Sequence, residues 1–352
     1  MSASEFVLWL DECTADSAER VGGKAVGLNA LLAQGMQVPP GFAIPTSAYR
    51  AWTVETGVGG EIARLLEGAE TIEAQQAASD RIRGLFEEAV LSANLQEELA
   101  LAYHRLGGGE DVPVAVRSSA TAEDSAAASF AGQQETYLWV QGATSVARHV
   151  VRCWGSLFTP QAIAYRAKLG MSLDGLAMGV VVQRIVPADT AGVMMTLDPV
   201  TGDPSQITIE AAFGLGTAVV GGEVTPDRYA VDKVTLEIRS RAVMTKHVAH
   251  RFDPQYGEVR AQEVHADLQS RPCLADDEVI EIARLGKRIE RALGCPQDVE
   301  WAVGPGSKSD REVFLLQARP ETVWSTRARA PIAVPGATVM DRMLRMMMPR
   351  RG

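Results

Sequence analysis

The chain has 352 residues, of which 46% are hydrophobic and 22% are charged, and its formal net charge at pH 7 is −10. This length predicts two or three lobes rather than one small core. The negative charge argues against nucleic acid and anionic membranes as main partners, so an anionic ligand would need a local cluster of basic groups.

The cysteines and the hydropathy pattern bear on the cellular compartment. The four cysteines, Cys13, Cys153, Cys273 and Cys295, form no CxxC pair, so they indicate neither a zinc site nor a disulfide framework. No run of about 18 apolar residues predicts a membrane span, and the first residues lack the basic and apolar regions of a signal peptide. We therefore expect a cytoplasmic protein with reduced thiols.

Leucines at positions 28, 31 and 32 have helical spacing and predict a helix that begins near Lys24, after two glycines. A lysine at a helix N-terminus can bind an anion together with free backbone N–H groups. The segment is not a Walker A loop, because the GxxxxGK spacing is missing and Ala25 stands where Ser or Thr would hold magnesium. A surface lysine beside a turn is the alternative interpretation.

The next hundred residues carry little sign of chemistry. Residues 35–52 predict a turn, a short strand and a helix capped by Thr46 or Ser47. Residues 59–106 contain no proline and are rich in Ala, Leu and Glu, with apolar residues at i, i+3 and i+4. This pattern predicts two or three amphipathic helices.

A short apolar run at 112–116 predicts a buried strand that ends on Arg117. Ser118, Ser119 and Thr121 follow, and a loop of small residues leads to 130–133. Arg presents a planar fork of donors to phosphate oxygens, and hydroxyls and backbone N–H groups supply more donors. The stretch therefore suits a polyphosphate, although a solvated serine loop after a strand explains it equally well.

Beyond a helical stretch at 144–169, broken near 158–160, the sequence alternates strands and turns. The apolar strand 176–186 contains Gln183, whose amide needs partners such as neighbouring groups or the edge of a purine. Strands at 191–197 and 207–211 flank the turn 198–202, and the second carries Glu210. Residues 228–264 predict β-hairpins. They contain an HxxH pair, which we interpret as two surface histidines rather than a metal site.

An amphipathic helix at 276–293 leads into a predicted hairpin of strands 298–303 and 313–320. Period-two alternation predicts two polar faces, made of Asp298, Glu300 and Ala302 and of Leu315, Gln317 and Arg319. If these faces coincide, Glu300 and Gln317 direct oxygens into one place with Arg319 beside them, which suits magnesium on a polyphosphate. A half-exposed polar face is the alternative. The composition of residues 325–339 predicts a linker. The Met/Arg-rich tail 340–352 is expected to form a docking helix or a disordered end.

The ordered set of these segments is recognisable. GGKAVGLNALLAQGMQVPPGFAIPTSAY, VRSSATAEDSAAASFAGQQETYL, VVVQRIV, DPVTG, EAAFGLGTAVVGGEVTPDRY and DVEWAV…LLQARPET occur in this order. Together they closely resemble the ATP-binding domain of the phosphoenolpyruvate synthase and pyruvate, phosphate dikinase family, which the rifampicin phosphotransferases share. The resemblance covers about residues 5–325.

The resemblance implies an α+β protein with the ATP-grasp fold, in which two lobes of mixed or antiparallel sheets and flanking helices hold ATP with Mg²⁺. We expect residues 1–110 to form part of the N-terminal lobe with a helical insertion, and 111–185 to form the phosphate loop and a helical segment. Residues 186–325 are expected to form the C-terminal lobe with the metal-binding hairpin, and 326–352 a linker and tail.

The resemblance also implies roles for individual residues. Lys24, Arg117 and Arg319 would contact the phosphates, and a loop from Gly132 and Gln133 to Thr136 would cover them. Gln183 would lie by the adenine and Glu210 by the ribose or nearby. Glu300 and Gln317 would hold Mg²⁺.

One departure from the family bears on function. Members carry a swivelling domain with a phosphorylatable histidine in a GGxxxH-like context, and none of the five histidines here has that context. The arrangement resembles phenylphosphate synthase, whose ATP-binding domain is a separate subunit. We therefore expect an ATP-binding subunit that transfers the β-phosphoryl group of ATP to a histidine of a partner carrier, with AMP and phosphate as products and pyruvate, a phenol or another compound as final acceptor. A non-catalytic ATP sensor or scaffold and a fragment of a longer synthase are the alternatives.

Overall fold

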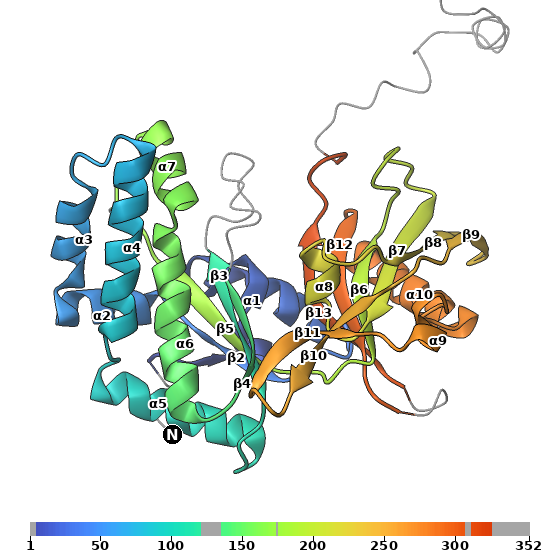
Figure 1. Ribbon diagram of the computed structural model, residues 1–352, viewed down its shortest axis with the longest axis horizontal. Coiled ribbons are helices and arrows are strands. Elements are labelled where there is room, and N and C mark those ends of the chain that lie inside the picture. Colours follow the sequence, from blue (N-terminus) through green and yellow to red (C-terminus); the bar gives the residue numbers. More distant parts are fainter. Residues whose placement is uncertain (1–4, 121–134, 174, 307–310, 326–352) are drawn as a thin grey trace, which may run out of the picture. The chain divides into compact units, whose positions relative to one another are not determined.

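The computed structural model describes residues 5–120, 135–173, 175–306 and 311–325 (Figure 1). The chain divides into two compact units, Met1–Glu321 and Thr322–Gly352. The first unit contains every helix and strand among the described residues. Within that part of the chain all strand pairs are antiparallel, which gives an α+β architecture.

The N-terminal sheet has five strands in the order β1-β2-β5-β3-β4. Its strands are β1 (Leu8–Trp9), β2 (Gly41–Ile44), β3 (Val114–Ala120), β4 (Thr136–Val140) and β5 (Met178–Arg184). The central strand β5 is buried on both faces, which explains its unbroken run of apolar residues. Val180 and Val182 face the helical core of this lobe, and Val181 faces the opposite side.

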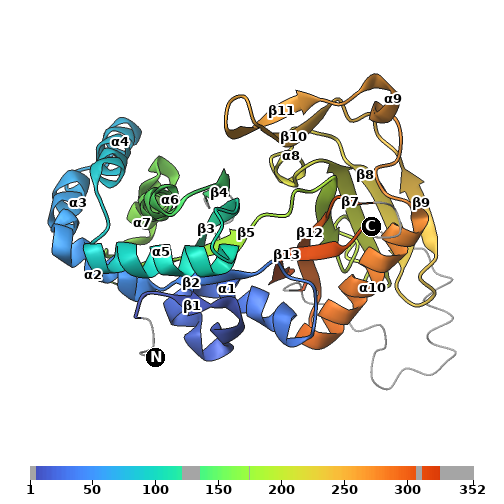
Figure 2. The ribbon, with the colours of Figure 1, turned by 90° about the horizontal axis from the view of Figure 1, so that it is seen from below.

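Most of the helices cover one face of this sheet (Figures 1 and 2). They are α2 (Thr46–Thr56), α3 (Val58–Leu66), α4 (Ile72–Glu88), α5 (Ala93–Gly107), α6 (Ala143–Gly155) and α7 (Pro160–Leu169). Aromatic side chains such as Trp52, Phe86 and Trp154 fill the core beneath them. The helices predicted at 59–106 and 144–169 are confirmed. The predicted side-chain cap of α2 is wrong, because Pro45 takes the cap position and the Thr46 hydroxyl donates to the Glu19 carbonyl instead.

Helix α1 (Ala18–Ala33) lies on the other face of the N-terminal sheet and also packs against β13. It begins six residues earlier than its apolar pattern predicts, but Gly22 interrupts it with φ 80° and ψ 166°. A Cβ atom at Gly22 would lie 2.3 Å from the carbonyl oxygen of Ser119, so only glycine allows this approach. Lys24 therefore lies near the start of the helical segment that follows the kink.

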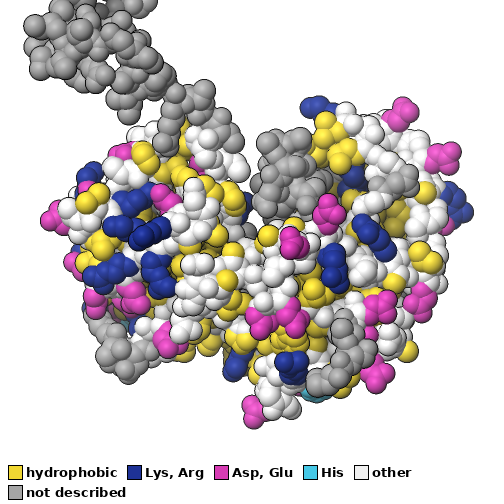
Figure 3. Space-filling view, turned by 180° about the vertical axis from the view of Figure 1, so that it is seen from behind, with side chains coloured by type: hydrophobic (Ala, Val, Ile, Leu, Met, Phe, Trp, Pro, Cys, Tyr) yellow, Lys and Arg dark blue, Asp and Glu magenta, His cyan; other side chains and the backbone are white. Residues whose placement is uncertain are grey.

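The C-terminal sheet has six strands in the order β13-β12-β6-β7-β8-β9. Its strands are β6 (Thr190–Met195), β7 (Gln206–Phe213), β8 (Asp227–Asp232), β9 (Ile238–Ala242), β12 (Gln297–Val303) and β13 (Val313–Pro320). Helix α10 (Asp276–Leu293) packs on one face, as its amphipathic pattern predicts. Short helices α8 (Thr217–Val220) and α9 (Ala266–Gln269) and a separate hairpin, β10 (Val248–Asp253) and β11 (Glu258–Glu263), complete this lobe. Figure 3 shows basic and acidic side chains interspersed over one face of the protein.

Candidate functional site

The hairpin β12–β13 brings two predicted metal ligands directly opposite each other. Glu300 pairs with Gln317, and Asp298 pairs with Arg319. The condition on which the sequence-based magnesium hypothesis depends, that the two polar faces coincide, is therefore met for these four residues.

The predicted alternation fails beyond this point. The register shifts between Glu300 and Trp301, so that Trp301 lies opposite Leu315 and residue 316 is the extra residue of a β-bulge. Leu315 consequently joins the buried core on the other face of the sheet instead of sharing a face with Gln317.

Two cations from the N-terminal lobe meet these oxygens. The Lys24 ammonium lies 2.8 Å from Gln317 Oε1. Arg117 Nη2 lies 2.5 Å from Glu300 Oε2 and 3.1 Å from Gln317 Oε1, while Nη1 donates to the carbonyl of Leu316 at 2.8 Å. Lys24, Arg117 and Gln317 are each less than 10% exposed. We call Lys24, Arg117, Glu300 and Gln317 the charge cluster.

The charge cluster holds Glu300 ionised. Burial by itself would raise the pKa of this carboxyl group, but the positive charges of Arg117 and Lys24 and the hydrogen bond from Arg117 keep it below its usual value. Arg117 retains one buried donor, Nε, without a hydrogen-bond partner among the described residues. An anionic ligand would accept a hydrogen bond from this donor and would also be attracted by the second cation, Lys24.

Arg319 lies at the outer edge of the charge cluster. Its Nε and Nη2 donate to Asp298 Oδ2 at 2.9 and 2.7 Å, and its side chain is half exposed. Sequence reasoning places Asp298 on the polar face of the hairpin but assigns it no role. Its position opposite Arg319 in the ladder follows from the same period-two pattern that locates Glu300.

Three other predicted site residues lie on the same faces of the two sheets as the residues of the charge cluster. Thr136 pairs with Arg117 at the start of β4. Gln183 is 2% exposed, and its amide donates to the Pro39 carbonyl at 3.2 Å. Glu210 lies two strands from Glu300 in one row across the sheet, about 10 Å away, and makes no ion pair with any described residue. Gly132 and Gln133 lie outside the described residues.

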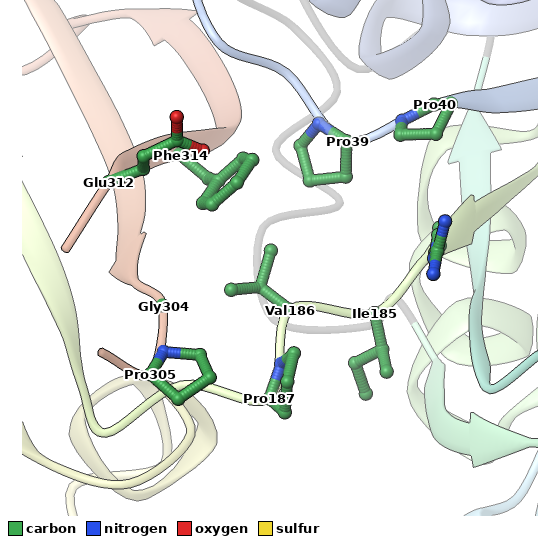
Figure 4. Close-up of a pocket in the computed structure, with 10 residues that line it drawn as sticks. Pro39, Pro40, Ile185, Val186, Pro187, Gly304, Pro305, Glu312 and Phe314 are labelled. Carbon is green, nitrogen blue, oxygen red and sulfur yellow. The ribbon is translucent and has the colours of Figure 1, made fainter. Parts of the chain in front are cut away.

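A cavity of about 320 Å³ opens beside the connection from β5 to β6 (Figure 4). It is lined by Pro39, Pro40, Arg184, Ile185, Val186, Pro187, Gly304, Pro305, Glu312 and Phe314. Gly304 follows Glu300 by four residues, about 13 Å along the strand, and Phe314 pairs with Ala302, which lies only about 7 Å along the strand from Glu300. The lining is mainly apolar and includes one basic and one acidic side chain.

The residues of the charge cluster do not form a complete cage for a metal ion. No group of three or more His, Cys, Asp or Glu side chains in the described ranges could hold one. Glu300 and Gln317 offer two hard oxygen ligands, which fits Mg²⁺, because this ion usually takes few protein ligands and completes its shell with phosphate and water. No helix in the described part of the chain is long and apolar enough to cross a membrane.

Comparison with known proteins agrees with this chemistry. The sequence matches the family described as "Pyruvate phosphate dikinase, AMP/ATP-binding domain" over residues 18–336. It is 40% identical over 360 residues to the phosphoenolpyruvate synthase of Aeropyrum pernix, a match that covers 94% of this chain and 44% of the relative. It is 42% identical over 323 residues to the probable phosphoenolpyruvate synthase of Methanocaldococcus jannaschii, covering 90% of this chain and 27% of the relative.

A third relative, the phosphoenolpyruvate synthase of Pyrococcus furiosus, is 35% identical over 370 residues, which cover 93% of this chain and 45% of the relative. The chain thus spans less than half of the length of these curated relatives. ATP and Mg²⁺ are the cofactors of the matched domain. The chain belongs to the AMP/ATP-binding domain family of the pyruvate phosphate dikinases and phosphoenolpyruvate synthases.

Proposed function

We propose that this chain is the ATP-binding part of a dikinase-type phosphotransferase and that its lobes form an ATP-grasp site. The observation that carries the proposal is the charge cluster, in which two nearly buried cations from one lobe meet two oxygen ligands from the other. A triphosphate with Mg²⁺ has the complementary composition. The cations would bind phosphate oxygens, and the carboxylate and amide oxygens would bind the metal.

When Mg-ATP binds, the side chains of the charge cluster would exchange their present partners for phosphate and metal. No charged side chain of the cluster would be left without a partner of opposite charge. Arg117 and Lys24 now neutralise Glu300 and satisfy Gln317. When the cations turn to the phosphates, Mg²⁺ would take their place on these oxygens. Glu300 and Gln317 would hold the metal, which would supply positive charge to offset that of the phosphates. Arg319 would reach the outer phosphates by leaving Asp298, which its half-exposed position allows.

The dimensions of the site suit a nucleoside triphosphate. The mainly apolar cavity beside 185–187 is large enough for a nucleobase, and about 7 to 13 Å of strand leads from its lining residues Phe314 and Gly304 to Glu300. Gln183 would act near the base, although its amide nitrogen already has a partner in Pro39. Glu210, which lies on the same face of the sheet, is the candidate for a contact to the ribose. Thr136, Gly132 and Gln133 would cover the phosphates.

The proposed reaction breaks ATP at both bridges of its β-phosphorus. A histidine nitrogen of a carrier attacks the β-phosphorus and AMP leaves, while the γ-phosphoryl group is released to water as inorganic phosphate. The residues of the charge cluster would stabilise the charge on the transferring and departing phosphates. The carrier histidine would come from a partner protein or from a further domain, and the final acceptor would be pyruvate, a phenol or another compound.

ATP labelled at the β-phosphate tests this proposal. The purified chain is incubated with labelled Mg-ATP, alone and with extract of the source cells, and AMP formation and acid-labile label on protein are followed. We expect label on a different polypeptide and AMP only when extract is present, and both should vanish with Glu300→Ala. AMP formation and pyruvate phosphorylation by the chain alone would contradict a carrier histidine outside this chain. Tight Mg-ATP binding without AMP under either condition would indicate a nucleotide sensor.

A further inference from the structure

The edge strand β4 contains a bulge where it pairs with β3. Val114 pairs with Val140 and Val116 with Tyr137, so that two residues, Leu138 and Trp139, lie opposite one residue of β3. Trp139 has φ 60°, a left-handed conformation that is costly for a bulky residue and easy for glycine. Bulges of this kind redirect a side chain, and a non-glycine residue there calls for a compensating contact.

The compensating contact comes from the other lobe. The Trp139 ring stacks on Phe252 of β10, with centroids 4.6 Å apart and planes 8° apart. Leu138 and Trp139 also belong to an apolar cluster that includes Val186, Phe314 and Leu316. Val186 and Phe314 line the cavity beside the connection between the lobes, so this interlobe contact is continuous with the proposed nucleobase pocket.

His250, which lies two residues before Phe252 in β10, attaches this strand to the C-terminal lobe. The His250 carbonyl accepts from the Leu215 N–H at 2.9 Å. Its ring nitrogens contact the Thr217 hydroxyl at 2.9 Å and the Glu223 carboxylate at 3.1 Å. These contacts hold the β10–β11 hairpin to α8 and to the residues on either side of it. The stack of Trp139 on Phe252 in turn links this hairpin to β4.

We propose that Trp139 and Phe252 are positioning residues that clasp the two lobes and prolong the residence of the nucleotide. The inference rests on the proposed function of the charge cluster. Strand β4 pairs with β3, which carries Arg117, and the C-terminal lobe carries Glu300 and Gln317. The Trp139–Phe252 stack joins the two lobes at β4. Helix α1 of the N-terminal lobe also joins them, because it packs against β13 of the C-terminal lobe.

The test is the dissociation rate of a fluorescent ATP analogue with Mg²⁺, measured by stopped flow on the full chain. Phe252→Ala and Trp139→Gly should each release the analogue about 2- to 10-fold faster, the effect of losing one aromatic pair. The double variant should be no faster than the more affected single variant, because both changes remove the same contact. Trp139→Phe, which keeps an aromatic ring, should retain most of the wild-type residence time.

Tyr256→Ala is the matched control, because Tyr256 is a 60% exposed aromatic residue of the same hairpin that stacks on Arg260 instead. It should release the analogue at the wild-type rate. An unchanged rate in Phe252→Ala, or additive effects in the double variant, would overturn the clasp. Thermal melting of each variant separates loss of the clasp from loss of the fold, and in Trp139→Gly the relief of the backbone conformation should offset part of the stability lost with the indole ring. Failure of the wild-type chain to bind the analogue would refute the proposed function instead.

Discussion

Replacing Glu300 by glutamine separates two roles that the charge cluster assigns to one carboxylate. In the proposed site and without metal, Glu300 would compete with an incoming phosphate for Arg117, to which it is bound at 2.5 Å. With Mg²⁺ it would serve as a metal ligand. Glu300→Gln keeps the size of the side chain and an oxygen acceptor but removes the charge. The variant should therefore bind metal-free ATP more tightly and lose the gain in affinity that Mg²⁺ confers.

The structure gives the size of the first effect. A hydrogen bond to a charged acceptor contributes about 1 kcal/mol more than a neutral one, and the Glu300 side chain is 27% exposed, so solvent screening prevents a much larger value. In the variant, breaking the hydrogen bond between Arg117 and the side chain at position 300 should therefore cost about 1 kcal/mol less than in the wild type. This difference corresponds to about fivefold tighter binding of metal-free ATP.

Titration calorimetry with ATP, in EDTA and in Mg²⁺, measures both effects. Glu290→Gln is the matched control, because Glu290 is 25% exposed and pairs with Lys233 at 2.7 Å, away from the charge cluster. It should behave as the wild type in both titrations. A wild-type response to Mg²⁺ in Glu300→Gln would show that Glu300 is not a metal ligand. Weaker binding of metal-free ATP would refute the competition for Arg117.

Three further substitutions test the surroundings of the charge cluster. Lys24→Met should weaken ATP binding at least tenfold, measured by calorimetry, because a charge-assisted phosphate contact contributes about 1.5–3 kcal/mol. Gly22→Ala should lower the free energy of unfolding in urea by about 2 kcal/mol more than Gly35→Ala. Both glycines have positive φ, but only at Gly22 would the added Cβ atom meet a carbonyl oxygen, at 2.3 Å. Arg83→Gln removes the 2.9 Å ion pair to Glu135, whose carbonyl accepts from the residue after Arg117. It should weaken binding of ATP several-fold but not of adenosine, and equal weakening of both would contradict this positioning role.

The charge cluster could be predicted in part because strand periodicity is a local property. Alternation along two strands predicted the polar faces that carry Glu300 and Gln317, and the pairing register in the structure places the two residues opposite each other. The same rule failed at Leu315, since a β-bulge depends on how a strand fits its neighbours and leaves no mark in a single strand's pattern. The glycines before Lys24 predicted that the helix begins there, whereas α1 begins at Ala18 and Gly22 allows the close approach of α1 to Ser119.

Contacts between distant segments were out of reach of sequence reasoning. The pairing of Arg117 with Glu300 joins residues 183 positions apart, and only the family resemblance places both at one ligand. The stack of Trp139 on Phe252 has no signal in the sequence, because Trp139 occupies a backbone conformation that favours glycine and its partner lies in a hairpin with an ordinary polar pattern. Gln183, predicted to need a partner, has one in the Pro39 carbonyl.

The most direct test of the central claim is a crystal structure of the chain with Mg²⁺ and a non-hydrolysable ATP analogue. Lys24 and Arg117 should leave Gln317 and Glu300 for phosphate oxygens, and the Glu300 carboxylate and the Gln317 amide oxygen should hold the metal. A nucleotide bound with the Arg117–Glu300 ion pair intact, or a metal held by other residues, would contradict the proposed site.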